Sequence, residues 1–507
     1  MLKASDQMQC KINIFDRNPS KRRHTDILYH ILLLLFTILN SYLNAQCDCD
    51  SLPPPPAGET IIYVNNTPEL LQAIHNASGK TTIYLNSGIY AVDTNTFINV
   101  TSPDITIRST TGNRNDVIIQ GMGMSAVGTG IGIYINNDNI TIANLTVKDV
   151  QNHAFFVTPG SDSSLFHNVA GIDCGEQIFK ASGTNSAPPK NGGVIQCSEF
   201  KYTTTLDDGD DGWYTNGIDL LNCHNWVIRD NFITNIRHNP SLTSTLAGPA
   251  ILVWHSSSGT LIERNRILHC DYGISLGNAG QGSVSHTGGI IKNNFITGHS
   301  GSDFGIGLIY APDAKVINNT VYSPGGWPHS IEARFSQTNN VIIMNNITDE
   351  HIWDDRDGAS CILTTNYTNV SATDFDNVNH GNLHLNAAHV WAVDAGTATN
   401  ERLKDIDCGN IQGTPDIGAD EFNNMLSLHR SHKISVKLFP NPTPGIFHIE
   451  GTDIDYIVIW DMNGQLIHKK IIHPEDNSIS LKHLKAGYYI VEMYYGNTVQ
   501  RRKLILR

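Results

Sequence analysis

Seven charged residues in the middle of the chain have the side chains that an elimination reaction beside a carboxylate needs. They are Glu176, Lys180, Asp219, Arg237, Arg264, Glu332 and Arg334. Such a reaction requires a base that takes the proton next to the carboxylate, and a positive charge that neutralises the carboxylate and acidifies that proton. We expect Lys180, Arg237 and Arg334 to supply the base or the positive charge. Glu176 and Glu332 could instead hold Ca²⁺, as could Asp219. The alternative for each is a solvated or salt-bridged surface residue.

An acidic run, Asp207-Asp208-Gly209-Asp210-Asp211-Gly212, lies in the longest insertion of the repeat pattern. Asp207, Asp208 and Asp210 offer the carboxylate oxygens that Ca²⁺ prefers. The run lacks the length and the terminal Glu of an EF-hand loop. It therefore predicts either a Ca²⁺ site of another type or a solvated acidic loop.

Trp254 and His255 are candidates for substrate binding, together with Asp219. Sugar rings stack on aromatic faces, so these two rings could form the floor of a binding site. Packing of Trp254 under a loop is the alternative.

The elements that must position these residues are short strands in a repeat. An apolar strand containing Asn recurs, and the last Asn of successive copies from residue 231 is 34, 29, 25 and 27 residues from the next. The copies are residues 142–147, 228–233, 262–267, 291–296, 317–321 and 344–347. A repeat of this length predicts a solenoid in which equivalent Asn side chains bond from coil to coil. A β-propeller, the rival, has longer repeats of about 40–50 residues.

With these repeats, residues 59–422 resemble the right-handed parallel β-helix family, an all-β fold. Thr67-Pro68 predicts a short N-terminal capping helix, with Thr67 as its N-cap. Residues 415–422 (PDIGADEF) are similar to the segment that closes many bacterial members. The resemblance implies a polysaccharide lyase, a polygalacturonase-like hydrolase or a non-catalytic adhesin, and the fold does not decide among them.

Strand alternation predicts which side chains face outward. Ile218 and Leu220 should point into the solenoid and Asp219 out of it. By the same register, the other outward residues are Leu252, Trp254, Ser275, Gly307, Ile309, Glu332 and Arg334. The small residues Ser275, Gly277 and Gly307 are expected to leave room for a groove.

Residues 214–219 (YTNGID) are locally similar to the first polygalacturonase motif, but Asn216 stands where hydrolysis requires a carboxylate. The Gly-His-Gly and Arg-Ile-Lys motifs of that family are absent from the sequence. The spaced Glu pair that precedes a Lys in the alginate and chondroitin lyase branch of the fold is also absent. We therefore favour a lyase over a hydrolase, without a match to a particular branch.

Charge divides the 507 residues into three parts. The chain holds 34 Lys and Arg against 48 Asp and Glu, a net charge of −14. Residues 1–45 and 433–507 each carry +3, so residues 46–432 carry −20. This acidic balance excludes a general nucleic-acid binder, and the 40% hydrophobic content excludes wholesale disorder. A polyanionic substrate would need bound Ca²⁺ or local cations.

The N-terminus is typical of a secretory signal peptide, assigned to residues 1–45. Lys21-Arg22-Arg23 precedes the apolar run 27–39, and Ala45 suits cleavage. The run is shorter than the roughly 20 residues of a membrane span, so a retained anchor is the weaker alternative, as is a lipoprotein at Cys47. Residues 46–58 form a Pro-rich linker.

Eight cysteines remain once Cys10 is removed with the signal peptide, and export permits disulfides. Four of them lie inside apolar strand patterns, which is typical of free, buried thiols. They are Cys174, Cys197, Cys223 and Cys270.

After a linker at 423–432, residues 433–507 resemble the C-terminal sorting domain of the type IX secretion system. The motifs are residues 435–445, the hairpin signal Asn463-Gly464 within 461–465, residues 484–491 and residues 503–506. The resemblance implies a small β-sandwich, a bacterium of the Bacteroidetes type, export across the outer membrane, and removal of this domain.

Taken together, the sequence predicts an exported, cell-surface or secreted β-helix protein that acts on polysaccharide. The favoured function is a lyase that cleaves an acidic glycan by β-elimination, with Ca²⁺ as the candidate cofactor. The alternative is a non-catalytic glycan-binding or matrix protein. The expected partners are a polysaccharide and the type IX machinery, with no nucleic acid and no stable membrane span in the mature form.

Overall fold

The structure is a computed structural model in which part of the chain is described. The described residues are 49, 51–93, 96, 98–126, 130–182, 187–204, 214–386, 390–401, 404–411, 413–422, 437–450, 454, 456–461, 466–471, 478–482, 484–495 and 498–507. The predicted signal peptide, the linker 423–432 and the Asn463-Gly464 turn lie outside them. So do Asp207, Asp208 and Asp210 of the acidic run. The chain divides into two compact units, residues 1–421 and 422–507.

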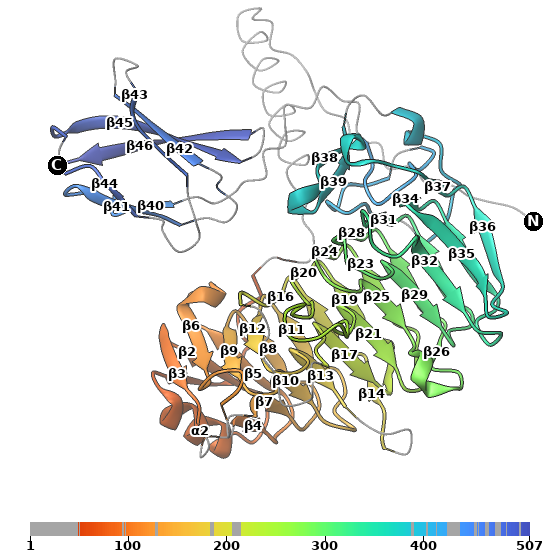
Figure 1. Ribbon diagram of the computed structural model, residues 1–507. Coiled ribbons are helices and arrows are strands. Elements are labelled where there is room, and N and C mark those ends of the chain that lie inside the picture. Colours follow the sequence, from red (N-terminus) through yellow and green to blue (C-terminus); the bar gives the residue numbers. More distant parts are fainter. Residues whose placement is uncertain are drawn as a thin grey trace, which may run out of the picture. The chain divides into compact units, whose positions relative to one another are not determined.

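The first unit is built from three long parallel sheets, and each turn of the chain adds one strand to each sheet (Figure 1). Neighbours in a sheet are strands one coil apart, so the sheets stack as a parallel β-helix, as the repeat predicts. Sheet I contains, in chain order, β4 (Ile98–Val100), β7 (Ile131–Ile135), β10 (His153–Val157), β13 (Phe179–Ala181), β17 (Ile218–Leu221), β21 (Ile251–Trp254), β25 (Ile274–Leu276), β29 (Ile306–Ile309), β32 (His329–Arg334) and β35 (His351–Arg356).

The other two long sheets complete each coil. Sheet II contains β1 (Thr60–Val64), β2 (Thr81–Leu85), β5 (Ile105–Ser109), β8 (Thr141–Ala143), β11 (Leu165–His167), β15 (Val194–Gln196), β19 (Val227–Arg229), β23 (Leu261–Glu263), β27 (Ile290–Lys292), β30 (Lys315–Ile317), β33 (Val341–Met344) and β36 (Cys361–Thr364). Sheet III contains β3 (Gly88–Ala91), β6 (Val117–Gln120), β9 (Thr146–Val150), β12 (Ala170–Cys174), β16 (Glu199–Lys201), β20 (Phe232–Thr234), β24 (Arg266–Leu268), β28 (Phe295–Thr297), β31 (Thr320–Tyr322), β34 (Ile347–Thr348) and β37 (Tyr367–Thr368).

Shorter sheets add to this unit. Four two-residue strands form a fourth parallel sheet between sheets I and II: β14 (Lys190–Asn191), β18 (Cys223–His224), β22 (Ser257–Ser258) and β26 (His286–Thr287). After the last coil, β38 (Phe375–Asn377) and β39 (Asn382–Leu385) pair antiparallel.

The core of the unit is the inside of the coils. The inward residues of the strands stack from coil to coil, and Ile218 and Leu220 are fully buried among them. The corner between sheets II and III needs a left-handed residue. Asn144, Asn293, Asn318 and Asn345 occupy it with φ of 52–57°, and Asn adopts this conformation more readily than most other non-Gly residues.

The predicted Asn ladder is present from residue 231 to residue 346, and it continues to Asn366. Each side-chain amide donates to the Oδ1 of the next Asn, at 2.9–3.0 Å, along Asn231, Asn265, Asn294, Asn319, Asn346 and Asn366. Asn144 lies instead at the left-handed corner position one residue before the equivalent of Asn231.

The predicted capping helix is α2 (Thr67–Asn76), at the N-terminal end of the stack (Figure 1). Its N-cap is Asn66 rather than Thr67, because the Asn66 side chain accepts the hydrogen bond from the Glu69 N–H. Thr67 donates its hydroxyl to the Ala91 carbonyl instead. None of the described helices is long and apolar enough to cross a membrane.

The cysteines follow the prediction with one correction. Cys174, Cys223 and Cys270 are free and buried. Cys197 is not free, because it forms a disulfide with Cys49, which ties the segment before the first strand to a coil 148 residues later. Cys408 is also disulfide-bonded.

The second unit consists of two small antiparallel sheets around an apolar core. One contains β40 (Lys437–Phe439), β41 (Ile446–Glu450) and β44 (Ser478–Ser480). The other contains β42 (Tyr456–Asp461), β43 (Leu466–Ile471), β45 (Gly487–Tyr495) and β46 (Thr498–Leu506).

Candidate functional site

A single row of outward residues crosses sheet I, with one residue from each strand in register. The row is Asn99, Tyr134, Phe156, Lys180, Asp219, Leu252, Ser275, Gly307, Glu332 and Trp353. The predicted register is therefore right. Lys180 and Glu332 are five strands apart, which at about 4.8 Å per strand separates them by roughly 24 Å.

The middle of this row is covered. Leu252 and Ser275 are each 1% exposed. A Cβ on Gly307 would lie 2.6 Å from the Phe304 ring, so that ring occupies the space above the glycine. The expectation that small residues leave a groove here is wrong, because Phe304 fills it. The sequence candidates thus fall into two separate groups, one around Lys180 and one around Glu332.

In the Lys180 group, Gln177 and Asp219 hold the ammonium in place, and Trp254 holds its counter-ion, Asp219. Lys180 Nζ donates to Gln177 Oε1 at 2.9 Å and lies 3.6 Å from Asp219 Oδ2. Trp254 Nε1 donates to Asp219 Oδ1 at 2.8 Å. Lys180 is 18% exposed and Asp219 is 1% exposed, so the ammonium is at the surface and its counter-ion is beneath it. Trp254, a candidate sugar-stacking residue, thus has a definite role in orienting Asp219.

Burial raises the pKa of Asp219 from 3.8 to about 6, against the opposing effects of the Lys180 charge and the Trp254 hydrogen bond. The desolvation of the carboxylate is therefore stronger than its pairing. Between about pH 4 and pH 6 the folded chain holds a proton at this site that the unfolded chain has released. The corresponding stability is fully present below about pH 4 and is lost as the pH rises through 6.

We expect the Asp219→Asn variant to lack this loss. The difference in free energy of unfolding between the variant and the native protein should therefore shift in favour of the variant by up to about 3 kcal/mol between pH 4 and pH 7, since one pKa unit corresponds to about 1.4 kcal/mol. Guanidinium unfolding at both pH values measures the difference. Asp313→Asn, at an exposed turn, is the matched control and should follow the native protein. An Asp219→Asn difference that is the same at both pH values would show that Asp219 does not titrate in this range.

Two groups that sequence reasoning did not single out, His153 and Asn152, join Glu176 to this site. His153 Nδ1 bonds to the Gln177 carbonyl at 2.8 Å, and its Nε2 lies 3.5 Å from Glu176 Oε2. Asn152 donates its side-chain amide to Glu176 Oε1. Burial, and next the charge of Lys180, lower the pKa of His153 to about 3, so its ring is neutral at physiological pH. His153 is one coil before Gln177, and counting one repeat back from Glu176 could have found it.

The sequence suggested that Glu176 and Lys180 share a strand. In the structure Glu176 precedes β13, which begins at Phe179. The two side chains are brought together around His153 instead, by the turn that leads into β13.

In the Glu332 group, the acid accepts hydrogen bonds from one cationic and one aromatic side chain. Glu332 Oε2 accepts from Arg356 Nη1 at 2.7 Å and from Trp327 Nε1 at 3.3 Å. The Arg356 guanidinium lies over the rings of Trp327 and Trp353, at 5.4 and 4.8 Å. Arg334 pairs with Asp357 and lies over Phe335. Trp327, Trp353 and Arg356 were not predicted.

The other residues that the sequence offered as candidates lie outside the Lys180 and Glu332 groups or make other contacts. Arg237 is exposed on the segment between β20 and β21, and its charge acts on His269 and Cys270 of the next coil. Arg264 is buried in ion pairs with Asp230 and Glu263, at 2.8 and 3.1 Å. His255 makes an edge contact with Trp254, and burial lowers its pKa.

Comparison with known proteins decides the nature of the second unit. Residues 437–507 match the family model of the secretion system C-terminal sorting domain. The chain carries a secretion sorting tail. It is therefore exported by type IX secretion to the cell surface or the extracellular space, as the motifs at residues 433–507 predicted. No curated protein matches the chain.

Solved structures share the parallel β-helix architecture. A pectate lyase, Pel9A, is 14% identical, with 74% of this chain and all of that chain covered and a TM-score of 0.44. An alginate lyase from Paenibacillus sp. str. FPU-7 is 16% identical over 61% of this chain and 99% of that chain, with a TM-score of 0.42. A pectin methylesterase from Yersinia enterocolitica is 14% identical over 64% and 96%, with a TM-score of 0.28. Similarity at this level concerns the fold alone and does not assign an activity to this chain.

Proposed function

We propose that this exported β-helix protein is a polysaccharide lyase that cleaves an acidic glycan by β-elimination at the Lys180 group. The observation that carries the proposal is the Lys180 ammonium, held by Gln177 and Asp219 at the outer surface of sheet I. A fixed, partly exposed ammonium suits the carboxylate of a uronate unit, and neutralising that carboxylate acidifies the neighbouring C–H.

His153 is the proposed base. Its Nδ1–H donates to the Gln177 carbonyl, so the Nε2 lone pair is the free one, and Glu176 beside it would stabilise the ring once it is protonated. The charge of Lys180 contributes to the low pKa of His153. A uronate carboxylate on Lys180 would cancel that contribution, so substrate binding raises the basicity of His153. His153 Nε2 takes the proton from the carbon beside the carboxylate, the electrons of that C–H bond form the C=C bond, and the C–O bond to the departing sugar breaks, its oxygen taking up a proton from water.

Among the described residues, no three His, Cys or acidic side chains around the Lys180 group come close enough together to share one ion. Glu176 Oε1 accepts from Asn152, and Glu332 is bound by Arg356 and Trp327. We therefore assign no step to Ca²⁺. The net charge of −20 on residues 46–432 still repels polyanions at long range, so added Ca²⁺ belongs in the assay as a screening ion.

The test is an assay of the purified secreted protein on alginate, pectate and glycosaminoglycans, with and without Ca²⁺. We expect the ultraviolet absorbance of an unsaturated product to appear with one of these uronate polymers. The absence of that absorbance on all of them would contradict the lyase proposal.

A second candidate function, non-catalytic glycan binding, is favoured by the Glu332 group. Its acid and both arginines are already paired, while Trp327 and Trp353 are partly exposed. Such a group suits sugar stacking better than proton transfer. Retention on a polysaccharide column without turnover would support this function over the lyase.

A further inference from the structure

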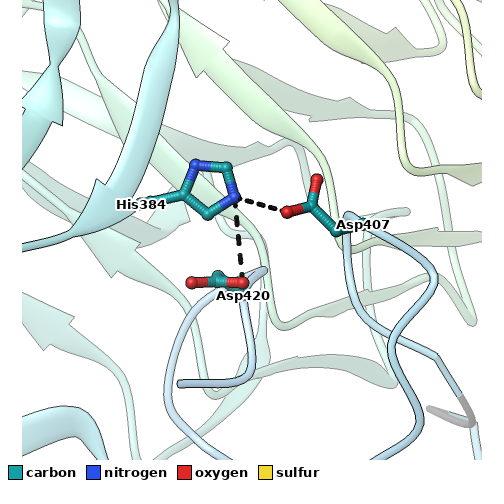
Figure 2. A group of neighbouring side chains, drawn as sticks. All are labelled: His384, Asp407 and Asp420. Carbon is teal, nitrogen blue, oxygen red and sulfur yellow. Dashed lines mark hydrogen bonds and ion pairs between the residues drawn. The ribbon is translucent and has the colours of Figure 1, made fainter. Parts of the chain in front are cut away.

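A second cluster of ionisable side chains lies beside strands β24 and β28 of sheet III, away from sheet I. His384 is on β39, Asp407 is on the loop after residue 404, and Asp420 is in the closing segment 415–422. Figure 2 shows the two carboxylates directed at the same ring nitrogen. His384 Nε2 lies 2.8 Å from Asp407 Oδ2 and 3.9 Å from Asp420 Oδ1.

The surroundings fix the free nitrogen of the ring. Asn382 Oδ1 accepts from the His384 backbone N–H at 3.3 Å, so the amide oxygen faces the histidine, and the same oxygen bonds to His384 Nδ1. Nδ1 therefore carries the hydrogen. In the neutral ring, the Nε2 lone pair then points at two carboxylates, an arrangement that a positive ion between them would stabilise.

Neighbouring contacts hold Asp407 and the His384 ring in place, as the outer coordination shell of a metal site does. Arg266 Nη2 donates to Asp407 Oδ1 at 2.8 Å, which leaves Oδ2 directed at the histidine. The Phe295 ring packs edge-on against His384, at 5.0 Å between ring centroids. Histidine ligands commonly donate their second N–H to an oxygen acceptor, as His384 does to Asn382.

We propose that His384 Nε2, Asp407 Oδ2 and Asp420 Oδ1 bind a divalent transition-metal ion of the zinc class. The three ligand atoms lie within 4.8 Å of one another. In a tetrahedral zinc site, with bonds of about 2.0–2.1 Å, ligand atoms are roughly 3.4 Å apart. The two separations at Nε2 fall on either side of this value, so the ligand atoms are near the spacing of a zinc site and would shift as the ion binds. An imidazole ligand favours a transition-metal ion over Ca²⁺, which prefers oxygen ligands.

The ion would tie three segments together. Asp420 belongs to the segment 415–422, His384 to strand β39, and Asp407 to the loop between them. Arg266 connects Asp407 to β24 in the coils. All three ligands are partly exposed, so a water molecule can take the fourth position. The role inferred is structural: metal binding fastens the closing segment against sheet III, where the Ala419 N–H already donates to the Thr320 hydroxyl.

The experiment uses the full secreted chain, freed of metal with a chelator and titrated with Zn²⁺. We expect one Zn²⁺ per chain by calorimetry, a rise in melting temperature on binding, and tetrahedral Co²⁺ absorption bands when Co²⁺ replaces Zn²⁺. Asp420→Asn keeps the shape of the ligand and should weaken Zn²⁺ binding by at least about tenfold, as should His384→Ala. His380→Ala removes an exposed imidazole on the neighbouring turn and should bind Zn²⁺ like the native chain.

Two results would overturn the proposal. One is the lack of saturable Zn²⁺ binding by the native chain, which would mean that a proton on Nε2 is the ion between the carboxylates. The other is equal binding by the native chain and both ligand variants, which would place the Zn²⁺ at another site. Neither result depends on whether the protein is a lyase.

Discussion

Replacing Asn294 by Ala should destabilise the β-helix by about 3–5 kcal/mol, a large effect for one side chain. Asn294 is fully buried. Its amide donates to Asn319 Oδ1 and to the carbonyls of Ile262 and Lys292, and its Oδ1 accepts from the backbone and side chain of Asn265. Removing the side chain leaves hydrogen-bonding groups on the preceding and following coils without a partner. Each such buried group costs about 1–3 kcal/mol of stability. Guanidinium unfolding measures the loss.

The matched control is Asn339→Ala. Asn339 also donates to two carbonyls, those of Ser336 and Gln337, but it is exposed on a turn where water can replace it. The control should change stability by less than about 0.5 kcal/mol. A loss of similar size in both variants would contradict a special role for the buried ladder.

The fold was predictable because its information is local and repeated. The spacing of Asn231, Asn265, Asn294, Asn319 and Asn346 gives the coil length, and period-two alternation gives the inward and outward sides of each strand. The Asn ladder follows from those two facts. The Cys49–Cys197 disulfide did not follow, because Cys197 lies in an apolar pattern like those of the free thiols, and the position of Cys49 depends on how the chain enters the first coil.

The site was only partly predictable, for a physical reason. Alternation placed Lys180, Asp219 and Glu332 on one outward row, but sequence distance along a solenoid does not show which parts of that row are covered. Phe304, from the segment before β29, fills the space above Gly307 and separates the two groups. The carboxylates of the metal candidate are not on coils at all. Asp407 and Asp420 follow the regular repeat, so no periodicity brings them to His384.

Replacing Lys180 by Met should lower the rate of elimination on the uronate substrate by about 10²–10³, if the protein is the lyase proposed above. Methionine keeps much of the length of the side chain and removes the charge that neutralises the carboxylate, and losing one such preorganised electrostatic contact typically costs this much. The loss should appear mainly in kcat, because the carboxylate gains charge density as the proton leaves. Initial rates of unsaturated-product formation measure it.

The Lys180 variant also leaves Asp219 buried beside no cation, so a loss of activity must be separated from a loss of structure. Lys180→Arg keeps the charge and should retain more activity than Lys180→Met, whereas a purely steric role would make arginine the worse replacement. Lys201→Met, which breaks the pair with Glu199 on sheet III, controls for removal of a lysine from the coils and should leave the rate unchanged. Thermal melts check that each variant is folded. A folded Lys180→Met protein with the native rate would show that Lys180 takes no part in the reaction. It would also exclude His153 as the base, because the proposal couples His153 to the substrate carboxylate through the charge of Lys180.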